Sequence, residues 1–212
     1  MCKFTTIILL LLVFLSSPTK ITAQHLDFQL LKSIYDNKNT VALSKAISYT
    51  TTITAFGVPV AMAGVALLKS DDELLKNALY TTASIGIVSV LTYSLKYSIN
   101  RRRPYLEYPN EFVRLDAYSG KSPSFPSGHT SLAFTTATAL SLKYPKWYVI
   151  APSYAWAGYV GYSRMNLGVH YPSDVITGAL LGAGSAWLTY EINEWYWNEK
   201  NKRKSKHAHV WY

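Results

Sequence analysis

The stretch AISYTTTITAFGVPVAMAGVALL, residues 46–68, contains no charged side chain and decides the fold class. As an α-helix it would be about 35 Å long, which is enough to cross the hydrocarbon core of a bilayer. Four further uncharged stretches follow it: 77–95, 130–142, 147–162 and 175–190. We therefore expect an all-α, polytopic membrane protein with about five spans. The alternative is a soluble all-helical bundle in which these apolar helices form the core.

Small residues are frequent in all five stretches, and they predict closely packed helices. In ITGALLGAGSAW (176–187), Gly178 and Gly182 are separated by four positions, which places them on one side of a helix. Together with the small residues between them they allow a neighbouring helix to approach closely. We expect this last span to pack tightly inside the bundle.

The N-terminal stretch MCKFTTIILLLLVFLSSPTKITAQ has the composition of a secretory signal. Cleavage after Ala23 would remove residues 1–23, and an uncleaved membrane anchor is the alternative. One helical domain over 24–197 and a basic cytoplasmic tail over 198–212 would follow. The single cysteine, Cys2, lies within the signal, so the chain contains neither a disulfide nor a cysteine zinc site.

The formal net charge of +9 does not indicate a nucleic-acid partner. The basic residues cluster at 101–103 and 200–206 and do not alternate with aromatic residues along one face. If the mature N-terminus lies outside, the five spans place the connections 69–76 and 143–146 and the basic tail in the cytoplasm, as the positive-inside rule favours. The loops 96–126 and 163–174 then meet on the opposite, periplasmic face. The arginines of the first loop oppose that rule unless they bind anions there.

These two outward loops carry the polar residues from which a phosphate site is built. The first begins KYSINRRRP and ends in PSGH at the start of the third span, and the second reads SRMNLGVHYPSD. A transferring phosphoryl group spreads negative charge over three oxygens, so fixed cationic donors stabilise it best. We expect Lys96, Arg103 and Arg164 to clamp the phosphate, with planar Arg forks and the point charge of Lys.

The start of the third span explains why a histidine stands at the mouth of an apolar helix. Ser127 and Gly128 are expected to add a hydroxyl and free backbone N–H groups directed at the anion. Pro126 fits the first helical turn, where no N–H is required. His129 is then placed to protonate the leaving oxygen, a role suited to a group that titrates near neutrality.

The second histidine, His170, is free to act as the nucleophile. Asp174 follows four residues later, within reach of the other ring nitrogen, where it would hold the tautomer and stabilise positive charge. Attack by His170 would give a phosphohistidine, which water resolves with His129 acting as base. No metal is needed, and the alternative is a zinc ion held by His129, His170 and Asp174.

Three blocks of the sequence together resemble the signature of the type-2 phosphatidic acid phosphatase superfamily. They run in the expected order between residues 96 and 174: Lys96-x6-Arg103-Pro104, Pro126-Ser127-Gly128-His129 and Ser163-Arg164-x5-His170-x3-Asp174. The resemblance implies a six-helix core bundle, counting an amphipathic helix near 26–35 as the first. It also implies a phosphatase that uses a histidine nucleophile and no cofactor. In such an enzyme, the residues that bind the phosphate or aid its departure would be Lys96, Arg103, Ser127, Gly128, His129 and Arg164.

The apolar segments favour the membrane branch of this superfamily. Bacterial members of that branch resemble undecaprenyl diphosphate, phosphatidylglycerophosphate and lipid A phosphatases. The resemblance therefore implies that the substrate is one of these lipid phosphates or phosphatidic acid. It also implies a protein of the bacterial inner membrane whose site faces the periplasm. Two alternatives stay open: a soluble periplasmic acid phosphatase, and a membrane protein that binds lipid phosphate without turnover. Arg114 and Lys121 are further candidates for a second phosphate, or solvated loop charges, while Arg101 and Arg102 are headgroup contacts or interface anchors.

Overall fold

The computed structural model of the chain describes residues 20–116 and 122–208, and all the regular secondary structure in this part is helical. Six long helices are joined by short connections, one short 3-10 helix (η1) and one four-residue helix (α5). In chain order the elements are α2 (Lys20–Tyr35), η1 (Lys38–Thr40), α3 (Val41–Lys69), α4 (Asp72–Ile99), α5 (Pro104–Glu107), α6 (Gly128–Lys143), α7 (Trp147–Asn166) and α8 (Pro172–Ala208). The prediction of an all-α fold with six main helices is confirmed.

Each of the five uncharged stretches lies within one helix, in the order α3, α4, α6, α7 and α8. The turn between α3 and α4 shows how local chemistry sets the boundaries. Ser70 ends α3 in the left-handed conformation (φ 52°), and the Asp71 side chain caps α4 by accepting a hydrogen bond from the Leu74 N–H (2.9 Å). Asn100 ends α4 in the same left-handed conformation (φ 48°), so the chain leaves the bundle just after Lys96.

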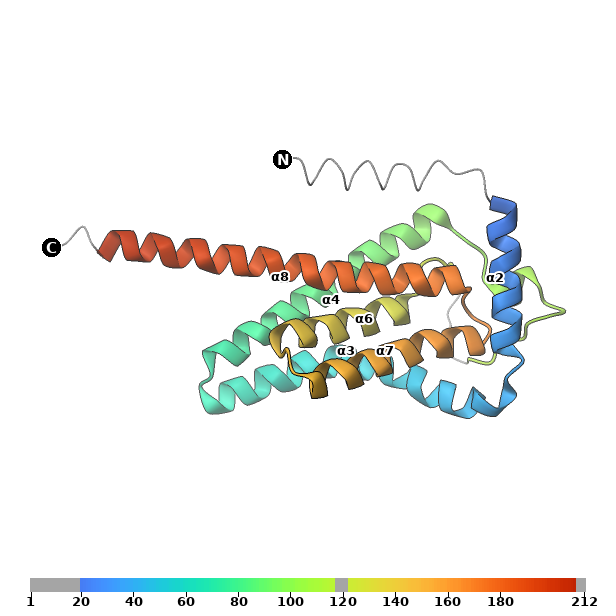
Figure 1. The fold of residues 1–212 in the computed structure, drawn as a ribbon, viewed down its shortest axis with the longest axis horizontal. Helices are drawn as coiled ribbons and strands as arrows, with labels where there is room; N and C mark the ends of the chain where they lie inside the picture. The colour runs from blue at the N-terminus through green and yellow to red at the C-terminus, as the bar shows by residue number, and fades with distance from the viewer. Residues whose placement is uncertain (1–19, 117–121, 209–212) are drawn as a thin grey trace.

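Helices α3, α4, α6, α7 and α8 lie along the long axis of the molecule, and α2 crosses one end of them (Figure 1). Helix α6 is central, because it packs against α3, α4, α7 and α8. The packing is close where α8 meets it: a Cβ added to Gly182 would lie 2.3 Å from the Ser131 carbonyl oxygen, and one added to Gly178 would lie 2.7 Å from that of Ser127. The predicted close approach of the last span is confirmed.

The crossing helix α2 is held by an aromatic cluster. Leu31 and Tyr35 of α2 are buried against Phe112 and Tyr171, and the rings of Tyr35 and Phe112 pack edge to face with their centroids 5.2 Å apart. Tyr171 begins the chain segment that leads into α8. Helix α2 therefore covers the end of the bundle where the two outward loops meet. The predicted signal sequence lies outside the described residues, apart from 20–23.

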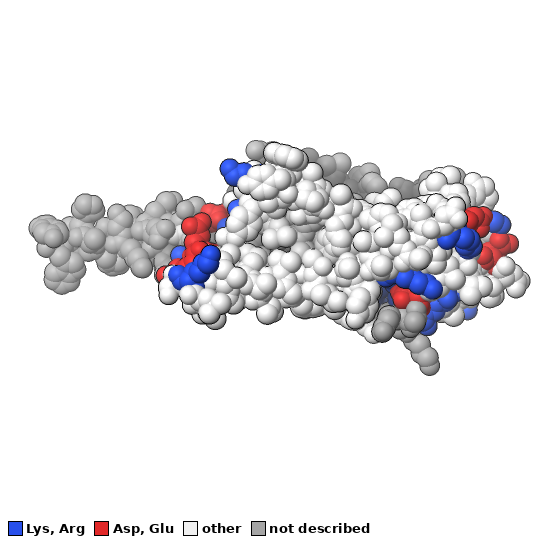
Figure 2. All heavy atoms as spheres, turned by 90° about the horizontal axis from the view of Figure 1, so that it is seen from below, with Lys and Arg blue, Asp and Glu red and all other residues white. Residues whose placement is uncertain are grey.

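Two helical stretches are long and apolar enough to cross a membrane by length and composition: Lys38–Lys69 and Asp72–Glu107. Large apolar side chains of α3 and α4 are half or more exposed, among them Phe56, Val60, Leu79 and Val90. Figure 2 shows Lys, Arg, Asp and Glu gathered toward the two ends of the body on the face displayed, with a broad uncharged band between them. Such a band matches the surface that a bilayer requires. The number of five spans stays a prediction.

Candidate active site

All of the predicted phosphate ligands except Ser127 line one cavity at the α2 end of the bundle. The cavity has a volume of about 550 Å³ and lies between α3, α4 and α6. Its polar lining includes six of the eight predicted site residues: Lys96, Arg103, Gly128, His129, Arg164 and His170. Its apolar lining includes Phe56, Val88, Tyr93 and Leu132. We call it the active-site cavity.

Lys96 and Arg103 are buried cations held by neutral oxygen atoms. The Lys96 Nζ donates to the Pro123 carbonyl (2.8 Å), and the Arg103 guanidinium donates to the carbonyl (2.8 Å) and hydroxyl (3.0 Å) of Ser122. Within the described part of the chain, neither side chain forms an ion pair. These contacts fix both side chains without neutralising them, so their positive charge remains available to an anion in the cavity.

Arg164 is the third cation, and it lies near the end of α7 with 1% of its surface exposed. Its Nη1 donates to Asp116 Oδ2 (2.8 Å) and to the Ser48 hydroxyl of α3. The guanidinium therefore joins α7 to α3 and to the loop before α6. Sequence reasoning placed Arg164 in the clamp but gave no signal for either partner, because Asp116 and Ser48 lie in no recognisable motif.

Asp174, the second residue after the start of α8 at Pro172, is fully buried and collects donors from three directions. Its Oδ2 accepts from the Ser124 hydroxyl (2.5 Å) and from the Tyr171 N–H (3.0 Å), and it lies 3.5 Å from the Nδ1 of His170. The other ring nitrogen of His170, Nε2, is thereby left for the cavity. This is the arrangement expected of a nucleophilic imidazole with an orienting carboxylate.

His170 lies in the connection between α7 and α8, with 2% of its surface exposed. Burial, reinforced by the positive charges of Arg103 and Lys96, lowers the pKa of His170 well below its usual value of 6.5. The imidazole is therefore neutral at physiological pH. Only the neutral ring has a lone pair with which to attack phosphorus.

At the start of α6, His129 lines the cavity but Ser127 does not. Ser127 is the N-cap: its N–H donates to the Asp174 carbonyl (3.0 Å), and its hydroxyl pairs with that of Thr130 (2.8 Å). Its hydroxyl thus faces α6 and not the cavity, which Gly128 and His129 line. Pro126 precedes the N-cap, so it does not occupy the first helical turn as expected.

Arg101 belongs to the site although the sequence suggested only a headgroup contact or an interface anchor. Its Nη1 pairs with Asp174 Oδ1 (2.8 Å), and its Nη2 pairs with Asp27 Oδ2 of α2 (2.9 Å). Asp27 also accepts from the N–H and hydroxyl of Ser173, and the Arg101 guanidinium lies 3.9 Å from the centre of the Tyr171 ring. The network links α2, the end of α4 and the start of α8. No sequence signal pointed to Asp27, because its partners are remote along the chain.

The remaining loop residues fall outside this cluster. Arg114 is exposed and donates from its Nε to the Asp116 carbonyl (2.6 Å), and Arg102 forms a surface ion pair with Glu107 (3.3 Å). Lys121 lies outside the described residues.

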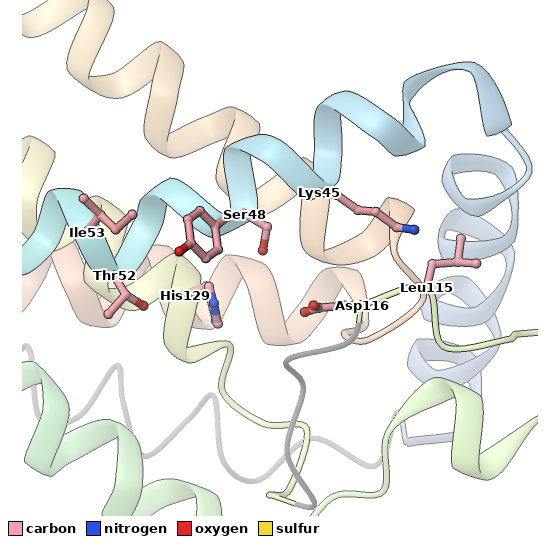
Figure 3. A pocket seen from close by; sticks show the side chains of 8 residues that line it. Lys45, Ser48, Thr52, Ile53, Leu115, Asp116 and His129 are labelled. Carbon is pink, nitrogen blue, oxygen red and sulfur yellow. The ribbon is translucent and has the colours of Figure 1, made fainter.

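A second cavity of about 460 Å³ adjoins the first on the α3 side. It is lined by Thr52 and His129, which also line the active-site cavity, and by Lys45, Ser48, Tyr49, Ile53, Leu115 and Asp116. Figure 3 shows Lys45, Ser48 and Thr52 projecting from α3 on one side, with His129 and Asp116 on the other. We call it the α3 pocket.

Over residues 20–116 and 122–208, no three His, Cys, Asp or Glu side chains gather closely enough to hold a metal ion. The three residues considered as zinc ligands, His129, His170 and Asp174, therefore do not form such a group. Asp174 pairs with Arg101 and accepts from Ser124, and it does not line the cavity that His129 and His170 share.

Comparison with known proteins gives one family and several relatives. The family model described as PAP2 superfamily matches residues 77–198, which contain all three blocks of motif residues. The chain is 35% identical to an undecaprenyl-diphosphatase of Sulfolobus acidocaldarius, over 52% of this chain and 56% of that protein. It is 34% identical to a lipid A 1-phosphatase of Rhizobium johnstonii, over 52% of this chain and 45% of that protein. The chain thus spans about half the length of the curated relatives it matches.

Two solved structures share the fold over most of their length. Aquifex aeolicus LpxE superposes with a TM-score of 0.65 and 26% identity, covering 78% of this chain and 95% of that one. A transmembrane PAP2-type phosphatidylglycerolphosphate phosphatase from Bacillus subtilis superposes with a TM-score of 0.68 and 24% identity, covering 91% of this chain and 95% of that one.

Proposed function

Because the chain belongs to the PAP2 superfamily, we propose that it is a metal-independent phosphatase that hydrolyses a phosphate monoester or diphosphate of a membrane lipid. The observation that carries the proposal is the single cavity that joins a neutral, carboxylate-oriented His170 to three buried cations. A phosphate that neutralises these cations would place its phosphorus beside the nucleophile. Binding alone would not require an oriented imidazole.

The reaction proceeds in two displacements. The Nε2 of His170 attacks phosphorus, the bond from phosphorus to the leaving oxygen breaks, and His129 gives that oxygen a proton. Burial and the positive charge of Arg164 lower the pKa of His129 to about 3, contrary to the expectation that it titrates near neutrality, so the ring carries this proton only when the negative charge of a bound phosphate offsets the surrounding cations. Lys96, Arg103 and Arg164 stabilise the charge on the three equatorial oxygens, and Asp174 stabilises the positive charge on the phosphohistidine. Water, deprotonated by His129, then attacks phosphorus and releases inorganic phosphate, which restores His170.

A lipid substrate fits the surroundings of the cavity. Phe56, Val88, Tyr93 and Leu132 line the same cavity as the cations, so an apolar chain and a phosphate are accommodated side by side. The names of the relatives, an undecaprenyl-diphosphatase and lipid A phosphatases, support the same class. The candidate substrates are undecaprenyl diphosphate, phosphatidylglycerophosphate, phosphatidic acid and lipid A.

We further propose that the protein lies in a bacterial inner membrane with five spans, after removal of residues 1–23, and that the site faces the periplasm. The helical domain of 24–197 would then end in a cytoplasmic tail of 198–212. In support, α8 begins beside the site at Pro172, and its far end extends beyond the opposite end of the bundle (Figure 1). The basic residues of 200–206 belong to that far end, as the positive-inside rule favours.

Phosphate release by the purified full-length protein tests the proposal. The substrates are the four lipids above and a soluble aryl phosphate. We expect turnover of at least one lipid by the wild type and none by His170→Ala, which still binds that lipid because the three cations remain. His25→Ala, at an exposed histidine of α2, is the matched control and keeps wild-type activity.

Three results would contradict the proposal. Normal hydrolysis by His170→Ala removes the nucleophile assignment. Turnover of the aryl phosphate alone indicates a non-specific acid phosphatase. Lipid binding without any turnover indicates a protein that only binds lipid phosphates.

A further inference from the structure

The two cavities differ in which histidine they contain. His170 lines only the active-site cavity, whereas His129 lines both that cavity and the α3 pocket. In phosphoryl transfer the attacking and leaving atoms lie roughly in line on opposite sides of phosphorus. The leaving oxygen therefore lies away from His170 and next to His129, and what is attached to that oxygen extends past His129 into the α3 pocket.

The charges of the α3 pocket favour an anionic group there. Its lining contains one carboxylate, Asp116, whose charge is offset by the ion pair with the buried Arg164 (2.8 Å). Lys45 is the one lysine or arginine among the described residues that line it, and its side chain lies on the α3 side in Figure 3. Unlike the buried Arg164, Lys45 is exposed to solvent.

The same pocket also has an apolar exit. Tyr49 and Ile53 line it, and both are largely exposed on the outer surface of α3, one of the two stretches long and apolar enough to cross a membrane. Lys45, Tyr49 and Ile53 are spaced four residues apart, so they follow one another along one side of the helix. A charged group beside Lys45 therefore continues directly into an apolar chain lying against Tyr49 and Ile53.

We propose that the α3 pocket is the leaving-group site, and that Lys45 binds a phosphate which stays on the lipid after cleavage. The preferred substrates are then lipid diphosphates, in which that phosphate is bonded directly to the one transferred. The bridging P–O bond breaks on the side of the terminal phosphorus, and the bridging oxygen stays with the lipid phosphate and takes the proton of His129. This inference rests on the proposed function, since it assigns the substrate class of the same reaction.

A pair of substrates with the same chain isolates the contribution of Lys45. We would measure kcat/KM for farnesyl diphosphate and farnesyl phosphate with the purified full-length protein in mixed micelles. In Lys45→Gln we expect kcat/KM for the diphosphate to fall about tenfold, while that for the monophosphate stays within about twofold of wild type. Lys45→Arg keeps the positive charge and should retain most of the diphosphate activity. Lys69→Gln, at the opposite end of α3, is the matched control and changes neither rate.

Each outcome has a distinct meaning. An equal loss on both substrates, or no loss on the diphosphate, overturns the role of Lys45 while lipid-phosphate hydrolysis stands. A wild-type protein that releases phosphate from neither farnesyl substrate nor any lipid of the wider panel overturns the proposed function itself. A selective loss on the diphosphate that Lys45→Arg restores supports the inference.

Discussion

Asp174 shows how one buried side chain organises the site at the scale of single residues. One oxygen faces Arg101, and the other accepts from Ser124 and the Tyr171 N–H while it lies beside the His170 ring. A buried carboxylate is tolerated only when it is paired and hydrogen-bonded. The same contacts that make its burial possible also fix its position relative to His170.

Arg101→Gln should therefore reduce turnover although Arg101 does not line the active-site cavity. The change removes the cation from Asp174 Oδ1, and a displaced carboxylate allows His170 to turn, so we expect kcat to fall about tenfold or more with little change in KM. Asp27→Asn weakens the same network without touching Asp174 and should lower kcat by less than Arg101→Gln does. Steady-state kinetics, with the melting temperatures of both variants, separate the effect on His170 from a loss of stability. Equal effects of the two variants on kcat would contradict the role of Arg101.

Arg164→Lys should lose much of the activity although it keeps the charge. A lysine supplies a point charge in place of a planar fork, and it cannot reproduce the two Nη1 contacts, to Asp116 and Ser48, that position the guanidinium. We expect kcat/KM to fall about a hundredfold, the usual effect of removing one donor to transition-state charge. Arg102→Lys, at the exposed ion pair with Glu107, is the matched control and should be neutral. Wild-type kinetics in Arg164→Lys would show that charge alone suffices.

At the scale of elements, the packing of α8 against α6 sets the position of the proposed catalytic groups. Gly178 and Gly182 let the α8 backbone lie against α6, and the Ser127 N–H then reaches the Asp174 carbonyl. The starts of the two helices are joined in this way, so the helix that carries His129 and the one that carries Asp174 have a fixed relation. Helix α2 adds a second constraint at the same end through Asp27.

Gly182→Ala should destabilise the protein, whereas Gly184→Ala should not. A Cβ at Gly182 would lie 2.3 Å from a backbone oxygen that cannot move aside, but one at Gly184 meets no atom within 4 Å. Overpacking of this kind costs about 1–3 kcal/mol, whereas an open glycine-to-alanine change in a helix is neutral or favourable. Thermal unfolding of both variants in detergent checks the prediction. A melting temperature for Gly182→Ala at or above that of Gly184→Ala would contradict the packing argument.

At the scale of the whole molecule, the exposed charged residues are concentrated toward the ends of the bundle on the face that Figure 2 displays. A broad uncharged band separates them on that face, and the three buried cations line one cavity. If a phosphate binds in this cavity as proposed, fixed side-chain charge neutralises it without a metal ion.

Chelators should therefore leave the activity unchanged. We expect phosphate release after treatment with EDTA to stay within about twofold of the untreated rate, because Lys96, Arg103 and Arg164 do the work that a metal ion would otherwise do. Added zinc should not raise the rate. Loss of activity in EDTA that zinc restores would indicate instead a metal held by His129, His170 and Asp174.

The sequence by itself determined where the helices lie and which three blocks of residues supply the proposed site. Uncharged stretches long enough for helices, small residues spaced by four, and three blocks of motif residues are local patterns, and helix geometry translates them directly into elements and faces. The pairing of His170 with Asp174, four residues apart, belongs to the same class of prediction.

Only the tertiary structure decided which remote side chains share the site. Asp27 reaches Arg101, Asp116 and Ser48 reach Arg164, and Lys45 lies at a pocket shared with His129, across large separations in sequence. It also turned the Ser127 hydroxyl toward Thr130 and away from the cavity. Such contacts depend on how whole helices cross and how closely they pack, and the spacing of residues along the chain carries no record of that geometry.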